Sequence, residues 1–247
     1  MLEEDQNIEW AQISWNPVIG CTPFSAGCQN CYARVIAEKF KHNKVKDYEN
    51  GFKLHLIPSR LTMPLSWRKP KKVFVNSMSD LFHEDVPDAF IEQVFNVMNK
   101  CDIHVFMVLT KRSERLKQIA PKLKWTPNIL MGVTIESNAY RHRLDDLKAT
   151  KAINKFICIE PFIGAIDKLN LTGLSWVIAG GESGPYARPM FDDWVRSLRD
   201  WCQEADVPFW FKQKSAYGER RAKATIDGHY YKEEPRLYKS PDLFDFL

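Results

Sequence analysis

Several patterns are scarce or missing in this sequence, and each absence narrows the possible functions. The six histidines never occur as H-x-H, so the sequence offers little to a metal-dependent barrel hydrolase. No apolar run approaches the length of a membrane span, and IHVFMVL (residues 103–109) is typical of the longest. The amino-terminal residues MLEEDQNIEW are acidic and lack the apolar core of a secretory signal. We therefore expect a cytoplasmic protein with no membrane association.

The excess of positive over negative charge is also small. The net charge of the 247-residue chain is +4 at pH 7, which permits a nucleic acid or another anionic partner without requiring one. Apolar residues make up 45% and charged residues 27%, which is typical of a globular protein long enough to bury a substantial core. Because cytoplasmic thiols stay reduced, the six cysteines indicate metal ligands or buried residues before they indicate disulfides.

Short runs of β-branched and aromatic residues alternate with helical patterns along the chain. The runs are nearly continuous in apolar character, as strands buried on both faces of a parallel sheet are. They predict strands at 73–77, 104–110, 129–136, 156–161, 176–181 and 208–213. Between them, apolar residues recur at helical spacing, as in Ile91, Val94, Phe95 and Met98. The alternation predicts an α/β fold, a partial (β/α)6-type barrel with parallel strands in a single domain over 1–247, with a doubly wound sheet as the alternative.

Two segments depart from this alternation. Residues 41–72 contain three prolines and the run GFKLHL, and we expect an insertion that packs over one end of the barrel. Regularity fades from residue 214, so 214–247 is predicted to be an irregular C-terminal extension. Its last residues, PDLFDFL, either dock a partner protein or pack back on their own domain.

Polar residues follow each predicted strand. The carboxyl ends of strands in β/α folds converge on the active site, and helix N-termini there offer N–H groups to anions. One cavity is therefore expected to gather Ser77, Ser79, Asp80, Lys111, Glu136, Glu160, Glu182, Arg188 and Lys212. The alternative is that these loops are polar because they meet water. In AGGESGPYARP, the glycines Gly180, Gly181 and Gly184 suit either close approach to a ligand or a tight turn.

The stretch GCTPFSAGCQNCYA, residues 20–33, spaces three cysteines as C-x6-C-x2-C. A four-iron cluster takes one thiolate per iron, so Cys21, Cys28 and Cys31 would hold a [4Fe-4S] cluster whose fourth iron is open to a small molecule. The alternatives are a zinc site with His42 as fourth ligand, a C-x2-C redox pair, and three structural cysteines. Three further cysteines have no such spacing, and the last two of them fall on buried patterns of the core: Cys101, Cys158 and Cys202.

Several motifs together resemble a known family: WNPVIGCTPFSAGCQNCYA, VFVNSMSDLFHEDVP, LTKR, GVTIE, EP, WVIAGGESGPYARPM and PFWFKQ. Between residue 15 and about residue 228, the sequence is similar to a phage- and bacteria-associated three-cysteine-motif family of poorly defined function. That family is related to the radical S-adenosylmethionine superfamily, which the cysteines and the β/α architecture also resemble.

The superfamily resemblance implies a cofactor as well as a cluster. The amino and carboxylate groups of S-adenosylmethionine would chelate the open iron held by Cys21, Cys28 and Cys31. With an electron from a donor, the cluster would cleave the sulfonium and release a 5′-deoxyadenosyl radical, which abstracts hydrogen from a substrate. If the cysteine loop follows the first strand, as in the superfamily, the site for the amino group of the cofactor corresponds to NSMSD here. The resemblance then implies that Ser77, Ser79 or Asp80 contacts the amino group and that Glu136 contacts the ribose. It implies contacts to adenine or substrate for Gly180, Gly181 and Glu182.

The sequence departs from the superfamily pattern within the cysteine loop. The first gap is six residues instead of the usual three. An aromatic residue usually precedes the last cysteine, but here Asn30 precedes it and Tyr32 follows it. These differences bear on the geometry of the cofactor more than on cluster binding.

A nucleic acid or nucleotide is the preferred substrate hypothesis, because the chain is mildly basic and the similar family is associated with phages. The substrate candidates at the predicted mouth are Lys111, Glu160, Arg188 and Lys212, with Arg112 and Lys214 adding positive charge. Aromatic side chains either stack bases or belong to the core: Phe82, Tyr186 and Trp210.

Two rival functions come from other classes. The strand-end residues Glu136, Glu160 and Glu182 suit the paired carboxylates of a barrel glycoside hydrolase. A non-catalytic nucleic-acid-binding or redox protein would use a cluster or zinc ion structurally. Its basic surface would be KRSERLKQIAPKLK (residues 111–124), which equally fits a solvated helix face.

Overall fold

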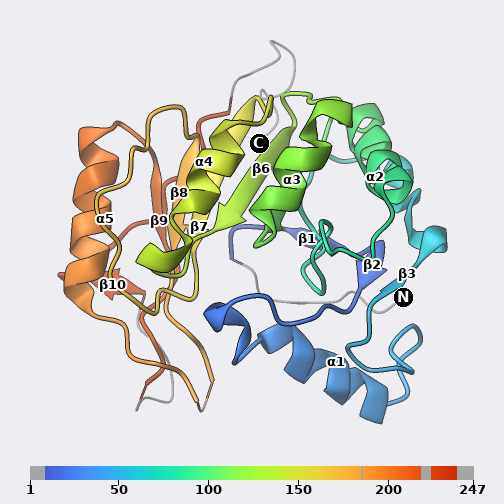
Figure 1. Ribbon diagram of the computed structural model, residues 1–247, viewed down its shortest axis with the longest axis horizontal. Coiled ribbons are helices and arrows are strands. Elements are labelled where there is room, and N and C mark those ends of the chain that lie inside the picture. The colour runs from blue at the N-terminus through green and yellow to red at the C-terminus, as the bar shows by residue number, and fades with distance from the viewer. Residues whose placement is uncertain (1–8, 185, 218–223, 238–247) are drawn as a thin grey trace.

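The structure is a computed structural model that describes residues 9–184, 186–217 and 224–237. One curled sheet of parallel strands dominates it, and the strands follow one another across the sheet in chain order (Figure 1). They are β1 (Ile13–Trp15), β4 (Lys72–Val75), β5 (Val105–Thr110), β6 (Ile129–Thr134), β7 (Asn154–Ile159), β8 (Trp176–Ala179) and β9 (Phe209–Phe211). All neighbouring pairs in this sheet are parallel, and together they form a half-barrel.

The predicted α/β class and the parallel strands are therefore confirmed. Each of the six predicted strands is present, with ends within two residues of the prediction. The sheet contains one strand beyond the six predicted runs, β1, which is only three residues long and whose sequence ISW has no extended apolar run. β1 pairs with β4 in a register that sets Ile13 beside Val73 and Trp15 beside Val75.

Four helices pack on the convex side of the sheet. They are α2 (Asp88–Lys100), α3 (Ser113–Ile119), α4 (His142–Lys148) and α5 (Asp192–Glu204), and their apolar residues share one core with the outward-facing side chains of the strands. The predicted stripe on α2 lies in this core, with Ile91 and Val94 fully buried. A doubly wound sheet would carry helices on both faces. Here the buried cluster on the concave side is built from strand residues and the two terminal segments.

The concave face has its own aromatic core. Side chains alternate along β7, so Phe156 and Cys158 face inward while Ile157 and Ile159 face the helices. A Cβ on Gly132 would lie 2.3 Å from the Phe156 ring, so the absence of a side chain there lets that ring pack flat across β6. The inward-facing aromatics and Trp10 from the amino-terminal segment fill the barrel below the strand ends. The open space is therefore left at the carboxyl ends of the strands.

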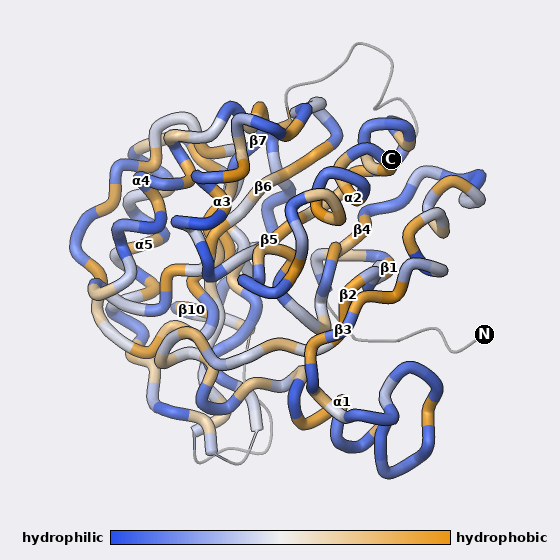
Figure 2. Tube along the Cα trace, turned by 45° about the vertical axis from the view of Figure 1, so that its right-hand side comes forward, coloured by the Kyte–Doolittle hydropathy of each residue, from blue (hydrophilic) through white to orange (hydrophobic). Residues whose placement is uncertain are grey.

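A second, smaller unit of structure joins the sheet at this end. It contains α1 (Tyr32–His42) and an antiparallel pair of β2 (Val18–Ile19) with β3 (His55–Leu56). Residues 41–72, predicted as an insertion, hold β3 and two 3-10 helices, Pro58–Arg60 and Met63–Ser66. α1 and the following loop protrude from one side of the barrel in Figures 1 and 2.

The chain beyond β9 returns along that strand. The N–H of Phe211 donates to the carbonyl of Tyr231 at 2.8 Å, and the N–H of Glu233 donates to Phe209 at 3.2 Å, so this segment covers the edge of the sheet. A short antiparallel pair, β10 (Thr225–Ile226) and β11 (His229–Tyr230), precedes it. PDLFDFL lies outside the described residues. Among the described helices, none has the length and apolar character needed to cross a bilayer.

Candidate functional site

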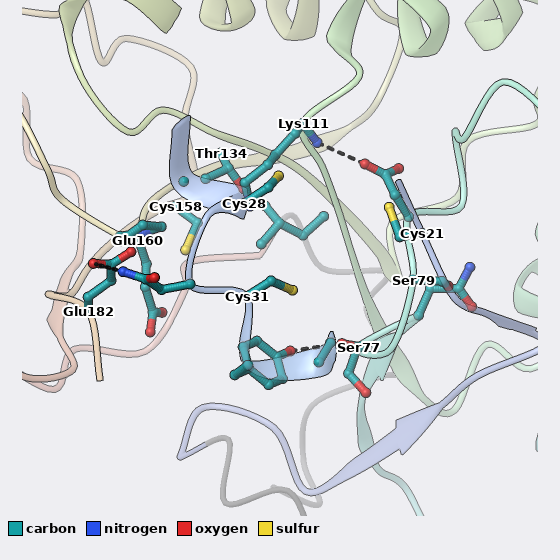
Figure 3. A pocket seen from close by; sticks show the side chains of 18 of the residues that line it. Cys21, Cys28, Cys31, Ser77, Ser79, Lys111, Thr134, Cys158, Glu160 and Glu182 are labelled. Atoms are coloured by element: carbon teal, nitrogen blue, oxygen red, sulfur yellow. Dashed lines mark hydrogen bonds between the residues drawn. The ribbon is translucent and has the colours of Figure 1, made fainter. Parts of the chain in front are cut away.

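A cavity of about 560 Å³ opens at the carboxyl ends of the strands, and the cysteine loop forms one of its walls (Figure 3). Cys21, Cys28 and Cys31 all line it. Most of the predicted site residues line it too: Ser77, Ser79, Asp80, Lys111, Glu160, Gly181, Glu182 and Lys212. Three do not line it but lie next to residues that do: Glu136, Gly180 and Arg188. Strand-end topology therefore accounts for the meeting of these residues at one cavity.

The strand ends hold the cysteine loop through hydrogen bonds. Ser25 Oγ donates to Glu136 Oε1 at 2.6 Å. A Cβ on Gly27 would lie 2.3 Å from the same oxygen, so the glycine permits this close approach of loop and strand end. Asn30 Nδ2 donates to Glu182 at 3.1 Å. Glu136 and Glu182, which were predicted to contact a cofactor, thus position the loop.

Tyr32, the first residue of α1, adds a further anchor. Its hydroxyl donates to the carbonyl of Ser77 at 2.8 Å, which ties the helix to the segment after β4. Burial of this hydroxyl raises the pKa of Tyr32, so it stays protonated as the bond requires.

Arg112 has a different place from the one predicted. It was expected to add positive charge at the mouth, and it does line the cavity, but its side chain is 3% exposed and its guanidinium faces the cysteine loop. It donates to Asp80 at 3.3 Å, to Cys21 Sγ at 3.5 Å and to the carbonyl of Thr22 at 3.1 Å. Its Nε also donates to both carboxylate oxygens of Glu84. Since its donors point to partners within the chain, Arg112 is a loop anchor.

Asp80 completes this anchor. One of its oxygens accepts hydrogen bonds from the N–H of Phe82 and the hydroxyl of Thr110, at 3.0 and 2.7 Å. The other accepts from the N–H of Lys111 and from Arg112. With two donors on each oxygen, Asp80 has little capacity left for a ligand.

Ser77 and Ser79 are also engaged within the chain. Ser77 Oγ lies 3.3 Å from the Asn16 side chain, and Ser79 Oγ donates to the carbonyl of Val18 at 2.9 Å. Both residues line the cavity, but their hydroxyls bind Asn16, which follows β1, and Val18 of β2.

The residue just before them was missed by the sequence analysis. Asn76 is 3% exposed, lines the cavity, and has neither its amide nitrogen nor its oxygen hydrogen-bonded within the described part of the chain. The hydroxyl of Thr134, also lining the cavity and 1% exposed, has no partner there either. A buried polar group without a partner is costly, so unpaired groups facing a cavity point to a polar ligand or water. Strand alternation from Phe74 and from Leu130 provides the signal that would have found both.

Two of the loop thiols differ in acidity in the metal-free chain. Burial raises the pKa of Cys21 to about 11, aided by Asp80 and opposed in part by Arg112. Burial alone would raise the pKa of Cys28, but the Lys111 ammonium and the backbone N–H of Phe24 outweigh it and lower that pKa. Lys111 therefore provides positive charge where thiolates would be formed.

The three thiols share the cavity without converging on one point. Among the described residues, no three His, Cys, Asp or Glu side chains lie close enough together to hold a single metal ion. His42, considered as a fourth zinc ligand, is exposed at the far end of α1 and does not line the cavity. The geometry therefore argues against the zinc site that the sequence left open.

A fourth cysteine lies in the same cavity. Cys158 on β7 is 2% exposed and belongs to the concave aromatic core, as expected, but it also lines the cavity. Burial and the neighbouring Glu160 raise its pKa, so the thiol stays protonated at neutral pH. Cys101 and Cys202 lie in the outer core.

Each predicted carboxylate faces a cation. Lys212 Nζ lies 2.6 Å from Glu160, and Arg188 binds Glu182 through its Nε at 2.9 Å and through a second nitrogen. Glu136 is flanked by Lys111 at 3.9 Å and Arg143 at 3.6 Å. Of the substrate candidates, Glu160, Lys212 and Lys111 line the cavity. Arg188 does not line it and serves as the partner of Glu182.

The remaining candidates for substrate binding and base stacking differ in exposure and pairing. Lys214 pairs with Asp192 at 2.5 Å. Phe82 is fully buried and Trp210 is 7% exposed, so both belong to the core, whereas Tyr186 is 81% exposed. Of the three aromatic residues, only Tyr186 is free to stack on a partner.

Comparison with known proteins adds a family but no activity. No curated protein sequence and no solved structure matches the chain. The family described as "Protein of unknown function (DUF5131)" matches residues 5–236, which is most of the chain. The chain therefore belongs to the DUF5131 family.

Proposed function

We propose that this protein is a radical S-adenosylmethionine-like iron–sulfur enzyme. The observation that supports it most is the placement of three thiols from one loop in a cavity at the carboxyl ends of a parallel half-barrel. The sequence resemblance to the superfamily predicted this combination of loop and barrel. The proposal extends to a cytoplasmic setting, in which the thiols stay reduced.

The residues of the cavity fit the cluster and the cofactor by their chemistry. Thiolates are the ligands of a four-iron cluster, and each binds a separate iron, so three of them need not converge on a single point. Asn76 offers an unpaired amide, with donor and acceptor both free, and Thr134 offers an unpaired hydroxyl. A polar cofactor bound beside the cluster would satisfy these buried groups.

The cluster and S-adenosylmethionine, when bound, would supply one-electron, hydrogen-abstracting chemistry. The protein itself would hold the cluster, orient the cofactor and shield both from water. Arg112 and Glu136 fix the loop that carries the thiols, and Lys111 offsets negative charge in the cavity. Asn76 and Thr134 would orient the polar groups of the cofactor. The aromatic core beneath them closes the barrel on that side, which limits access of water.

The test is anaerobic purification with iron and sulfide reconstitution, followed by EPR of the reduced protein with and without S-adenosylmethionine. We expect a reduced-cluster signal that changes when the cofactor is added, together with formation of 5′-deoxyadenosine. A cluster that does not respond to the cofactor would favour the structural or redox role instead. A colourless protein with stoichiometric zinc would refute the proposal.

The glycoside hydrolase alternative receives less support from the geometry. Such an enzyme needs one carboxyl group that holds a proton at working pH. Burial alone would raise the pKa of Glu182, but hydrogen bonds from Arg188 and Asn30 lower it, so Glu182 does not suit that role. Glu160 is bound by Lys212, and Glu136 does not line the cavity.

A further inference from the structure

One segment beside the cavity carries a clear excess of positive charge. Residues 31–60, here called the basic lobe, contain seven Lys and Arg against three Asp and Glu, a net charge of +4. The whole chain also has a net charge of +4, so the remainder is neutral overall. The lobe consists of α1, the following loop, β3 and a short 3-10 helix. Figure 2 shows its loop as one of the most hydrophilic parts of the molecule.

The cations of this lobe are largely unpaired. Five of its lysines are exposed and form no ion pair with any residue that the structure describes: Lys39, Lys41, Lys44, Lys46 and Lys53. Of the three acidic residues, Asp47 already pairs with Arg60 at 3.0 Å. The lobe therefore presents positive charge that the protein itself does not neutralise.

The basic stretch at residues 111–124 provides a contrast. Arg115 and Lys122 both pair with Asp88, and Lys117 pairs with Asp146. Arg112 is buried against the cysteine loop. The stretch that the sequence marked as a nucleic-acid surface is thus largely neutralised.

The lobe borders the cavity directly. α1 follows Cys31 without a break, and Tyr32 and Ile36 on this helix line the cavity. The helix runs from there toward the lysines, over a length of roughly 16 Å at 1.5 Å per residue. A long polyanion bound along the lobe would therefore pass the mouth of the cavity.

The make-up of the exposed surface indicates which anion it suits. Protein interfaces are depleted in lysine and have an apolar or aromatic centre. Two large apolar side chains of the lobe are exposed, Tyr32 and Val35 in the first turn of α1. From residue 36 to residue 60 none is exposed, and the exposed positions there are mostly Lys, Asn, His and Glu. Lysine and polar side chains are typical contacts of a phosphate backbone. This surface fits a nucleic acid better than an acidic protein.

We propose that the basic lobe binds the phosphate backbone of a nucleic acid and leads it past the mouth of the cavity. This inference names the substrate class of the proposed enzyme. The role of the nucleic acid as a substrate rests on the proposed function, whereas its binding to the lobe does not. Binding itself can be measured whether or not a cluster forms, so the two proposals can fail separately.

The test is fluorescence anisotropy with a short labelled single-stranded DNA of mixed sequence, over a range of salt concentrations. The full chain is used, both as purified and after iron reconstitution. The variant K41E/K44E/K46E changes three exposed lysines of the lobe. The matched control is K100E/K124E/K151E, which changes three exposed lysines at the opposite end of the strands and alters the net charge equally.

We expect the lobe variant to bind at least about tenfold more weakly and the control to change much less. Each phosphate contact to a single strand contributes about −0.7 to the slope of log K against log salt, so losing three contacts would reduce the slope by about 2. Circular dichroism melting identifies any loss of folding, and the milder K41Q/K44Q/K46Q should show a smaller loss in the same direction. Equal losses in the lobe and control variants, or tighter binding of polyglutamate than of DNA, would overturn the proposal. The second of these results would indicate an acidic protein partner.

Discussion

Ser25 Oγ and Glu136 Oε1 lie 2.6 Å apart although 111 residues separate them in the sequence. The bond joins the middle of the cysteine loop to the segment after β6. Glu136 is fully buried, and its other carboxylate oxygen has no hydrogen bond within the described chain. Ser25 is therefore one of the few partners of a buried carboxylate, and the position of the loop depends on it.

Replacing Ser25 by alanine should loosen the loop. The substitution leaves a buried carboxylate oxygen without its donor, which costs about 1–3 kcal/mol. We expect urea unfolding to show this loss, and iron content after reconstitution to fall. The control is S66A, because Ser66 donates only to the carbonyl of Met63 at the surface. Equal stability and iron content in the two variants would show that the Ser25 bond does not hold the loop.

Replacing Arg112 should destabilise the protein more than replacing any neighbouring Lys or Arg. R112M removes the guanidinium from Asp80, Glu84 and the loop at once, and breaking a buried charge pair typically costs about 3–5 kcal/mol. R112K keeps the charge but loses the planar fork, so it should restore only part of the stability. R112K also keeps a positive charge beside Cys21, whereas R112M removes one that lowers the pKa of that thiol. We therefore expect faster reaction of Cys21 with a thiol reagent in metal-free R112K, because the loop is looser, with mass spectrometry identifying the site.

Arg115 provides the comparison for Arg112. It is half-buried and binds Asp88 and the carbonyl of Val86, with no contact to the cysteine loop. R115M should lose some stability while the reactivity of Cys21 stays at the wild-type rate. A parallel rise in reactivity in R112K and R115M would indicate general destabilisation and contradict a specific anchoring role.

Single cysteine-to-serine variants should distinguish the cysteines that bind the proposed cluster from those that do not. C21S, C28S and C31S are each expected to abolish the iron–sulfur absorbance after reconstitution, since each removes the thiolate of one iron. C158S is expected to retain it, because the proposed cluster uses only the three loop thiols. C202S, in the outer core, serves as a control for substitution of a buried cysteine. Loss of the cluster in C158S with retention in C202S would identify Cys158 as a fourth ligand and leave no open iron.

Glu182 should make the fold sensitive to acid. Burial alone would raise its pKa, but hydrogen bonds from Arg188 and Asn30 outweigh it and lower the pKa below its ordinary value of 4.5. The unfolded chain then binds the proton more readily, so this contribution to stability is complete above the unfolded pKa and is lost as pH falls through the lower folded pKa. We expect wild-type Tm to drop between pH 5 and pH 3 by more than the Tm of E182Q. Identical pH profiles would show that the Glu182–Arg188 pair does not contribute.

The sequence predicted the strands and the convergence of their polar ends because both follow from periodicity and topology. Buried runs such as 129–136 indicate strands directly, and the strand ends must meet at one edge of a parallel sheet. What side chains do at that edge depends on packing that no pattern contains. Arg112 was expected to add positive charge at the mouth, and its guanidinium is instead buried against the loop that folds over it.

Asn76 was missed for the opposite reason. In the sequence, Ser77, Ser79 and Asp80 look equally suited to bind a ligand, and only the three-dimensional contacts show that their polar atoms are already used. Asn76 has a left-handed backbone, with φ of 60°, at the turn that follows β4. That conformation marks Asn76 as a turn residue, and asparagine tolerates it well. Alternation from Phe74 would have placed its side chain on the concave side of the sheet, but only the three-dimensional contacts show that its side-chain amide has no partner among the described residues.

Thr134 and Asn76 provide the most direct test of a polar ligand in the cavity. T134V removes an unpaired buried hydroxyl and keeps the shape of the side chain, so the ligand-free protein should be as stable as wild type or more stable. N76G removes the amide and suits the left-handed backbone, so it avoids the strain that alanine would introduce. In both variants we expect iron content to match wild type and the Tm increase on adding S-adenosylmethionine to shrink. N138A, which alters an exposed asparagine paired with Asp167, is the control and should keep the full increase. If T134V and N76G also keep it, these two groups do not bind the cofactor, and their unpaired atoms are satisfied by water instead.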